Sequence, residues 1–218
     1  MQKNKIAYFI TGTDTDVGKT YIASALVRYF VQQGQTAVGM KPIAAGCEKI
    51  NGELRNADVN ALLAASNIAA RLEEMNPYAF EPAIAPHIAA EQVGATVSLN
   101  KIKHAFDALQ SQADVVIVEG AGGFRVPINR EQTMADLAVQ LNLPVIMVVG
   151  VRLGCINHAL MTAGSIRAAG LDLVGWVANR IEPDMPALEE NVQTLKAMIK
   201  APCIADVNWG AVPKFSGI

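Results

Sequence analysis

Six short segments rich in valine and isoleucine recur along the chain, and amphipathic stretches of helical length lie between most of them. The apolar segments span residues 6–10, 36–40, 114–119, 144–150, 173–179 and 203–207. Near-continuous apolar runs of this length are typical of strands that are buried on both faces of a parallel sheet. The alternation of strands and helices therefore predicts an α/β fold, with a doubly wound, mostly parallel sheet flanked by helices.

Four amphipathic stretches are predicted to form helices around this sheet, at residues 19–34, 98–112, 158–170 and 185–200. Gly34 is typical of the position that follows a helix, and Ser98 is a typical N-cap. The interval 42–98 contains a helix-like stretch at 57–66 but no strong strand, and we expect it to be a functional excursion over the strand ends. Residues 208–218 are expected to be a loosely held tail.

Length, charge and cysteine content indicate the number of domains, the partners that are disfavoured and the cellular compartment. With 218 residues, 51% of them hydrophobic, the chain is expected to form one domain over residues 1–218. A net charge of -2 without a basic cluster does not favour nucleic acid or an anionic membrane as a partner. No apolar stretch approaches the roughly 20 residues that span a bilayer. Three widely separated cysteines predict reduced thiols in a cytoplasmic protein.

The stretch GTDTDVGKT, residues 12–20, follows the first apolar run and precedes a predicted helix. This is the setting of a phosphate-binding P-loop, whose usual pattern is G-x-x-x-x-G-K-S/T. That pattern would place its first glycine at position 13, where this chain has Thr13, and the glycine stands one residue earlier as Gly12. Backbone N–H groups would form an anion cradle, Lys19 would supply a point charge to the phosphates, and Thr20 would ligate Mg²⁺. The alternative is an ordinary strand-to-helix turn.

Polar residues end three other apolar runs, at the sheet edge where doubly wound proteins bind ligands. Lys41 follows the second run and could stabilise a phosphoryl group, while Glu119 ends the third and could ligate Mg²⁺. The alternatives are a solvated lysine and a surface carboxylate. Asp58 is either another ligand or an acid at a helix start, and Asn179 either contacts a base or caps a turn. The three histidines show no spacing typical of a metal site or a catalytic triad.

Five motifs of this chain together resemble those of one known enzyme family. GTDTDVGKT, KPIAAG, VEGAGG with VPI following, VGVRLGCINH and GWVAN resemble the dethiobiotin synthetase family in order and spacing, and they extend over nearly the whole chain. The displaced glycine belongs to the P-loop of that family. The resemblance implies an ATP-dependent cyclo-ligase of biotin biosynthesis, in which 7,8-diaminononanoate reacts with CO₂ to form a carbamate. The carbamate then attacks the γ-phosphate of MgATP, and the second amine displaces phosphate from the mixed anhydride to give dethiobiotin.

The resemblance also implies roles for individual residues. Lys19 and Lys41 would be catalytic, because carbamate and γ-phosphate are both anions and need positive charge to approach one another. Thr20, Asp58 and Glu119 would hold Mg²⁺. The residues placed at the nucleotide are Asp16, Val17, Gly18, Lys19, Thr20, Tyr21, Asp58, Glu119, Gly120, Ala121, Gly122, Asn179 and Asn208. The residues placed at the substrate are Thr15, Lys41, Ala45, Gly122, Gly154, Cys155 and Asn157.

Part of this substrate site would come from the second subunit of a homodimer, because the resemblance implies that residues 154–157 bind the substrate carboxylate across the subunit interface.

The chain departs from the family at two positions. Ala45 stands where a hydroxyl residue is frequent, which removes a side-chain hydrogen bond to the substrate. Asn208 precedes Trp209 where a proline is frequent at the adenine pocket.

A P-loop switch ATPase of the partitioning or septum-site type is the alternative function. Those proteins carry an additional lysine early in the loop, whereas residues 13–17 of this chain contain none. The C-terminus also lacks the pattern of a basic amphipathic membrane helix. The sequence therefore favours the synthetase.

Overall fold

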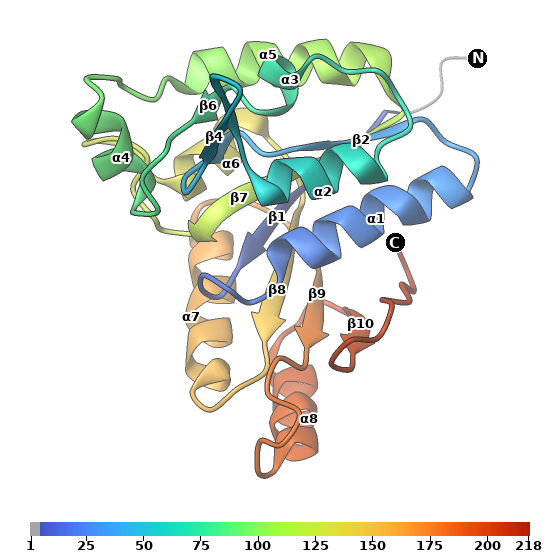
Figure 1. Ribbon diagram of the computed structural model, residues 1–218. Coiled ribbons are helices and arrows are strands. Elements are labelled where there is room, and N and C mark those ends of the chain that lie inside the picture. The colour runs from blue at the N-terminus through green and yellow to red at the C-terminus, as the bar shows by residue number, and fades with distance from the viewer. Residues whose placement is uncertain (1–4) are drawn as a thin grey trace.

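A sheet of six parallel strands forms the centre of the computed structural model, which describes residues 5–218 (Figure 1). The strand order is β10 (Cys203–Val207), β9 (Leu173–Asn179), β8 (Val145–Gly150), β1 (Ile6–Gly12), β7 (Val115–Gly123) and β2 (Ala37–Met40). Each neighbouring pair is parallel. The six apolar runs of the sequence are these six strands, so the predicted α/β fold is confirmed. The carboxyl ends of all six strands point to the same edge of the sheet.

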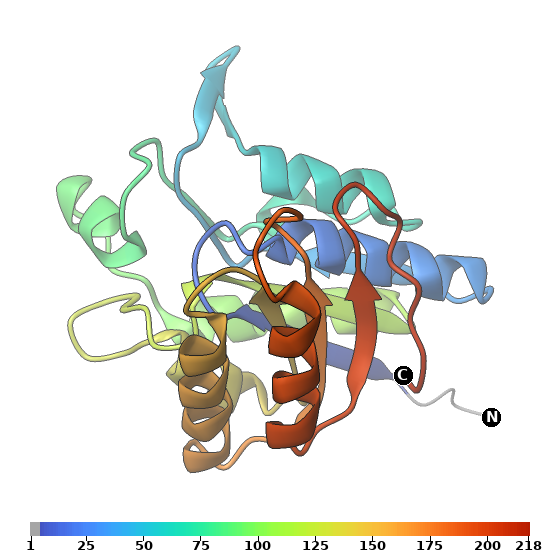
Figure 2. The ribbon, with the colours of Figure 1, turned by 90° about the horizontal axis from the view of Figure 1, so that it is seen from below.

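Helices cover both faces of this sheet (Figure 2). One face packs against α1 (Lys19–Gln32) and α2 (Ala57–Ala65). The other packs against α5 (Leu99–Gln112), α6 (Met134–Leu141), α7 (Cys155–Ala168) and α8 (Leu188–Met198). Successive strand residues alternate between the two apolar cores: Phe9 lies on the side of α5, and Ile10 lies on the side of α1. Because both faces are covered, nearly every strand position must be apolar, which explains the continuous runs in the sequence.

The helix ends follow the predicted signals in part. Gly34 adopts a φ of 78° just beyond α1, and the Ser98 hydroxyl accepts a hydrogen bond from the Lys101 backbone N–H at the start of α5. α7 begins three residues before its predicted stretch, and α8 begins three residues after its own. α6 is not among the predicted helices; the Asp136 carboxylate caps its start by accepting a hydrogen bond from the Thr133 backbone N–H. Within residues 5–218, no helix is both long and apolar enough to cross a membrane.

The interval 42–98 contributes no strand to the central sheet, as predicted. Its short elements are β3 (Ile43–Ala44), β4 (Glu48–Ile50), β5 (Glu53–Arg55), α3 (Leu72–Met75), β6 (Tyr78–Ala79) and α4 (Pro86–Gln92). β3 pairs with β6, and β4 and β5 form a hairpin that projects from the body of the molecule (Figure 2). The hairpin turns through Asn51 and Gly52, which both adopt positive φ, as the common two-residue hairpin turn requires.

The C-terminal residues 208–218 lie along α1, so the expectation of a loosely held tail is wrong (Figure 1). The Tyr21 hydroxyl donates a hydrogen bond to the Ala211 carbonyl at 2.6 Å. Further along α1, the ring of Tyr29 meets the ring of Phe215 edge-on, with centroids 5.8 Å apart. Aromatic contact and hydrogen bonding together hold the tail, and neither is visible from local sequence.

Candidate active site

A cavity of about 900 Å³ opens at the carboxyl edge of the sheet. Eleven of the predicted site residues line it: Thr15, Asp16, Gly18, Lys19, Thr20, Lys41, Ala45, Asp58, Glu119, Ala121 and Gly122. The remaining lining residues form an apolar wall that sequence reasoning missed: Ile43, Ala83, Ile84, Ala85, Pro86 and Val126. For residues 83–86 the sequence offers one signal, the prolines at positions 77, 82 and 86, which indicate an excursion over the strand ends but not which side chains face the cavity. Ile43 and Val126 have no such signal.

Steric contacts explain the displaced glycine of the P-loop. A Cβ atom at Gly12 would lie 2.7 Å from a methyl group of Val17. A Cβ atom at Gly18, where φ is 88°, would lie 2.2 Å from the amide nitrogen of Asn179. Thr13 is not among the residues with positive φ. A β-branched residue therefore fits the position where the usual pattern has glycine, whereas positions 12 and 18 do not tolerate a side chain.

Lys19 is folded back onto the P-loop in this structure. Its Nζ donates a hydrogen bond to the Asp14 carbonyl at 2.8 Å, and the residue is 7% exposed. Burial, together with the nearby charge of Lys41, lowers the pKa of Lys19 to about 8. The Asp14 carboxylate accepts hydrogen bonds from the Thr15 backbone N–H at 2.8 Å and from Arg152 at 2.6 Å. The P-loop is thus anchored by Arg152, in the segment between β8 and α7, which sequence reasoning did not single out.

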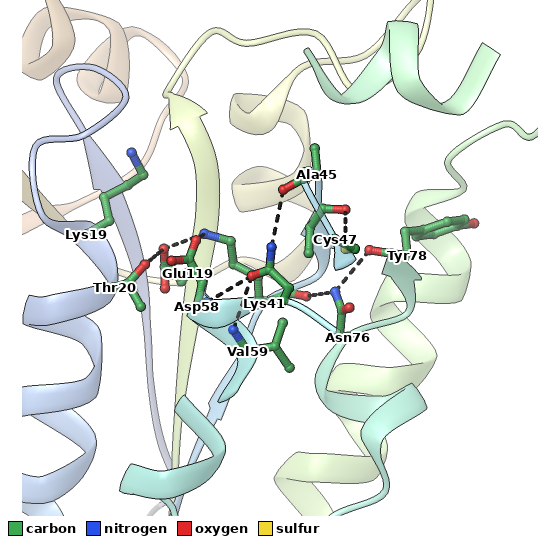
Figure 3. Close-up of polar contacts among 12 residues, drawn as sticks. Lys19, Thr20, Lys41, Ala45, Cys47, Asp58, Val59, Asn76, Tyr78 and Glu119 are labelled. Carbon is green, nitrogen blue, oxygen red and sulfur yellow. Dashed lines mark hydrogen bonds and ion pairs between the residues drawn. The ribbon is translucent and has the colours of Figure 1, made fainter. Parts of the chain in front are cut away.

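Lys41 lies between two carboxylates in the cavity (Figure 3). Its Nζ is 2.5 Å from Glu119 Oε1 and 2.8 Å from Asp58 Oδ2, and the Thr20 hydroxyl donates to Glu119 Oε1 at 2.7 Å. Since Lys41 is 5% exposed and Glu119 is fully buried, the alternatives of a solvated lysine and a surface carboxylate are wrong. Burial alone would lower the pKa of Lys41, but the two carboxylates outweigh it and raise that pKa. Burial opposes the ionisation of Asp58 as well, yet Lys41 holds the pKa of Asp58 below its ordinary value.

The oxygen atoms around Glu119 fit a hard divalent cation. Glu119 Oε2 is buried and has no hydrogen-bond partner among residues 5–218. The Thr20 hydroxyl donates a hydrogen bond to Glu119 Oε1, and the Asp58 carboxylate contacts Lys41 in the same cavity, so that a hydroxyl and two carboxylates line one place. Mg²⁺ prefers oxygen ligands and fills its other positions with water or phosphate oxygens. The donor set therefore suits Mg²⁺ beside a bound nucleotide.

Several residues predicted for the site lie outside the cavity lining. Asn179, at the end of β9, is buried, and its amide nitrogen donates to the Val17 carbonyl at 2.8 Å, so this group supports the P-loop. Tyr21 contacts the tail, and Asn208 is exposed just beyond β10. Gly120 continues β7 beside Glu119. Gly154, Cys155 and Asn157 lie at the start of α7, where Cys155 is buried and the other two are exposed.

Known proteins resemble this chain closely over nearly its whole length. A family model described as an AAA domain matches residues 7–212. The ATP-dependent dethiobiotin synthetase BioD of Aromatoleum aromaticum is 50% identical over 211 residues, which are 97% of this chain and 92% of that protein. The protein of the same name from Nitrosospira multiformis is 53% identical over 197 residues, which are 90% of this chain and 85% of that protein.

Solved structures share the fold at much lower identity. The signal recognition particle receptor FtsY from Elizabethkingia anophelis, in complex with GDP, has a TM-score of 0.54 at 15% identity, covering 100% of this chain and 62% of that chain. The MinD cell division protein of Aquifex aeolicus has a TM-score of 0.55 at 15% identity, covering 92% of this chain and 81% of that chain. These likenesses show the fold alone. Identity at about half of the positions over nearly the full length shows more, and on that ground the chain belongs to the family of ATP-dependent dethiobiotin synthetases.

Proposed function

We propose that this protein forms dethiobiotin, ADP and phosphate from 7,8-diaminononanoate, CO₂ and ATP. The observation that carries the proposal is the buried ammonium of Lys41, held between Glu119 and Asp58 in the P-loop cavity. A reaction between two anions needs a fixed cation at the place where they meet. On the resemblance to dethiobiotin synthetases, these anions would be a carbamate and the γ-phosphate of ATP.

The P-loop and the start of α1 would hold the phosphates of ATP. Asp16, Gly18 and Thr20 line the cavity where the first turn of α1 leaves backbone N–H groups without helical partners, a setting that favours phosphate. Lys19 would exchange its contact with the Asp14 carbonyl for one with the β- and γ-phosphates. We place the adenine between Asn179 and the tail around residue 208, on the family resemblance.

Thr20, Asp58 and Glu119 would hold Mg²⁺. The unpartnered Oε2 of Glu119 is available to the metal while Oε1 keeps its contacts with Lys41 and Thr20. When bound, Mg²⁺ neutralises charge on the β- and γ-phosphate oxygens. The protein's part is to fix these three oxygen donors within β7 and at the starts of α1 and α2.

The apolar wall of the cavity suits the hydrocarbon chain of the diamine. Ile43, Ile84 and Val126 line the same cavity as Thr15 and Lys41, which we place against the carbamate. Because the carboxylates raise its pKa, Lys41 remains an ammonium at neutral pH and can orient the carbamate oxygen toward the γ-phosphorus. With the substrates bound, side chains on this wall would shield the mixed anhydride from hydrolysis by water.

A second copy of the chain would complete the substrate site. Residues 154–157 do not line the cavity of their own protomer, and the nearby apolar side chains of Leu153 and Met161 are 88% and 66% exposed. A homodimer that covers this surface would bring the N-terminus of α7 to the substrate carboxylate of the neighbouring subunit. Three free cysteines fit a location in the reducing cytoplasm.

Product analysis tests the proposal. Dethiobiotin should form only when ATP, Mg²⁺, bicarbonate and the diamine are all present, and phosphate release should depend on the diamine. Equal ATP turnover with and without the diamine, and no dethiobiotin, would contradict the synthetase and support the switch ATPase. The likeness to MinD does not favour that alternative, because at 15% identity it reports the fold alone.

A further inference from the structure

Asn56 uses both ends of its side-chain amide at the start of α2. Its Oδ1 accepts hydrogen bonds from the backbone N–H groups of Asp58 at 3.0 Å and Val59 at 3.4 Å, which caps the helix. Its Nδ2 donates to the Ala45 carbonyl at 3.2 Å. One side chain therefore joins the first turn of α2 to the segment that follows β3.

These contacts close the base of the projecting β4–β5 hairpin. The chain leaves the cavity wall at Ala45, runs through the hairpin and returns at Asn56. All three residues of β4 are exposed, and the hairpin contributes Leu54 of β5 to the small apolar cluster that contains Val59 of α2. The link from Asn56 to Ala45 bypasses the hairpin and fixes α2 directly to the segment that carries Lys41 and β3.

Asp58 is the second residue of α2, so the direction of its carboxylate follows the geometry of the first helical turn. That carboxylate lies 2.8 Å from Lys41 Nζ, which in turn contacts Glu119. A change of a few tenths of an ångström at the cap would move one member of this group relative to the other two. Groups that orient metal ligands in this way typically change metal affinity by about 10–100-fold when they are removed.

We propose that Asn56 is a positioning residue that fixes the Asp58 carboxylate relative to Lys41 and Glu119, and so sets the affinity of the site for the metal–nucleotide complex. The inference rests on the metal-binding role that the proposed function gives to Asp58. Asn56 touches neither metal nor substrate; it acts through the helix cap and through the Ala45 carbonyl.

The test is a titration of Mn²⁺ by electron paramagnetic resonance, in the presence of a non-hydrolysable ATP analogue. Asn56→Ala should weaken Mn²⁺ binding by about tenfold or more. Asn56→Ser keeps an oxygen that can cap α2 but cannot reach Ala45, so its affinity should lie between those of Asn56→Ala and the parent protein.

Ser98→Ala is the matched control, because Ser98 caps α5 away from the cavity. Both alanine variants should lower the melting temperature by about 2–4 °C, as loss of one N-cap does in a chain of this size. Only Asn56→Ala should change Mn²⁺ affinity. Equal Mn²⁺ affinity in Asn56→Ala and the parent overturns the proposal, and so does an equal loss in Ser98→Ala.

The titration needs neither the diamine nor turnover, so it separates this inference from the proposed reaction. If the parent protein forms no dethiobiotin and Asn56→Ala still loses Mn²⁺ affinity, the reaction is wrong and the positioning role stands. Asp58→Asn provides the remaining check, because normal Mn²⁺ binding in that variant would remove Asp58 from the metal site and overturn the inference.

Discussion

Two lysines line one cavity, but their surroundings give them different freedom. The ammonium of Lys41 is fixed by Glu119 and Asp58, whereas that of Lys19 donates to a backbone carbonyl of its own loop. A hydrogen bond within a loop is more easily exchanged for a phosphate oxygen than a pair of buried ionic contacts. Lys19 is therefore suited to move onto the phosphates when the nucleotide binds. Lys41 is suited to hold its charge at a fixed point where the substrates react.

Removing each lysine should separate these roles. Lys41→Ala should bind ATP almost normally but turn over on the order of 10²–10³ times more slowly, because it removes a preorganised charge that acts mainly in the transition state. Lys19→Ala should lose ATP affinity as well as rate, because its charge contacts the phosphates throughout. Calorimetric measurement of ATP affinity and steady-state measurement of kcat, made on both variants, test whether affinity and turnover are lost separately. A Lys41→Ala enzyme with the parent kcat would show that Lys41 is not catalytic.

The lowered pKa of Lys19 predicts a pH effect on nucleotide binding. Its pKa of about 8 lies below the ordinary value of 10.5, so above about pH 8 the free protein has largely lost this charge. Bound phosphates favour the charged form and raise the pKa again, so nucleotide binding must take up a proton. The same shift means that burial of the charged lysine costs stability at neutral pH, and that this cost disappears as the pH rises from about 8 to 10.5.

Calorimetry at about pH 8.5, in buffers of different ionisation enthalpy, should therefore show uptake of roughly half to one proton per bound nucleotide. Lys19→Arg is the matched control, because arginine stays charged at this pH and has no proton to gain. Equal proton uptake by the parent and by Lys19→Arg would contradict the shifted pKa.

At the scale of elements, the placement of α2 depends on close packing against β2. A Cβ atom at Gly39 in β2 would lie 2.7 Å from Cδ2 of Leu62, which is fully buried in α2. The absence of a side chain at Gly39 lets α2 approach the sheet, and α2 carries Asp58 into the cavity. A packing contact on the face of the sheet thus determines where a carboxylate lies at its edge.

Gly39→Ala should destabilise the protein by about 1–3 kcal/mol, because the added methyl group overpacks this contact. It should also weaken the Mg²⁺ dependence of activity, since α2 must shift. Gly175→Ala is a matched control: its Cβ would lie equally close, 2.7 Å, to Ile204 in β10, far along the sheet from the cavity. Urea unfolding should show comparable losses for both variants, and Mg²⁺ titration should show a change only for Gly39→Ala. An unchanged Mg²⁺ titration in Gly39→Ala would show that Asp58 does not depend on this packing.

Most of the architecture could be predicted from the sequence, because each strand of the central sheet is buried on both faces and therefore appears as a continuous apolar run. The P-loop, Lys41 and Glu119 were accessible for a related reason: each directly follows or ends such a run. Contacts between segments were not accessible. Asn56 reaches Ala45 across 11 positions and Arg152 reaches Asp14 across 138, and neither pairing leaves a local pattern. The same applies to the apolar wall of the cavity and to the tail on α1.

At the scale of the whole molecule, the proposed shared site predicts that activity depends on assembly. Dilution below the dissociation constant of the dimer should abolish dethiobiotin formation, because each cavity would lose the α7 N-terminus of its neighbour. Leu153→Asp should shift that loss to higher protein concentration, since it places a charge on an exposed apolar side chain next to this helix. Sedimentation velocity and activity, measured over the same concentrations, provide the test. A monomer with full specific activity would contradict the shared site.

In such a dimer, the ion pair between Asp14 and Arg152 would connect the nucleotide site of one subunit to the substrate site of the other. Arg152 lies two residues before the segment that we assign to the neighbour's substrate, while Asp14 belongs to the loop that we assign to the subunit's own nucleotide. Occupation of one site would then alter the free energy of binding at the other, and linkage requires the effect to be reciprocal and equal in size. The binding sites of the two subunits would be coupled, so that binding of the diamine to one subunit changes the ATP affinity of the other.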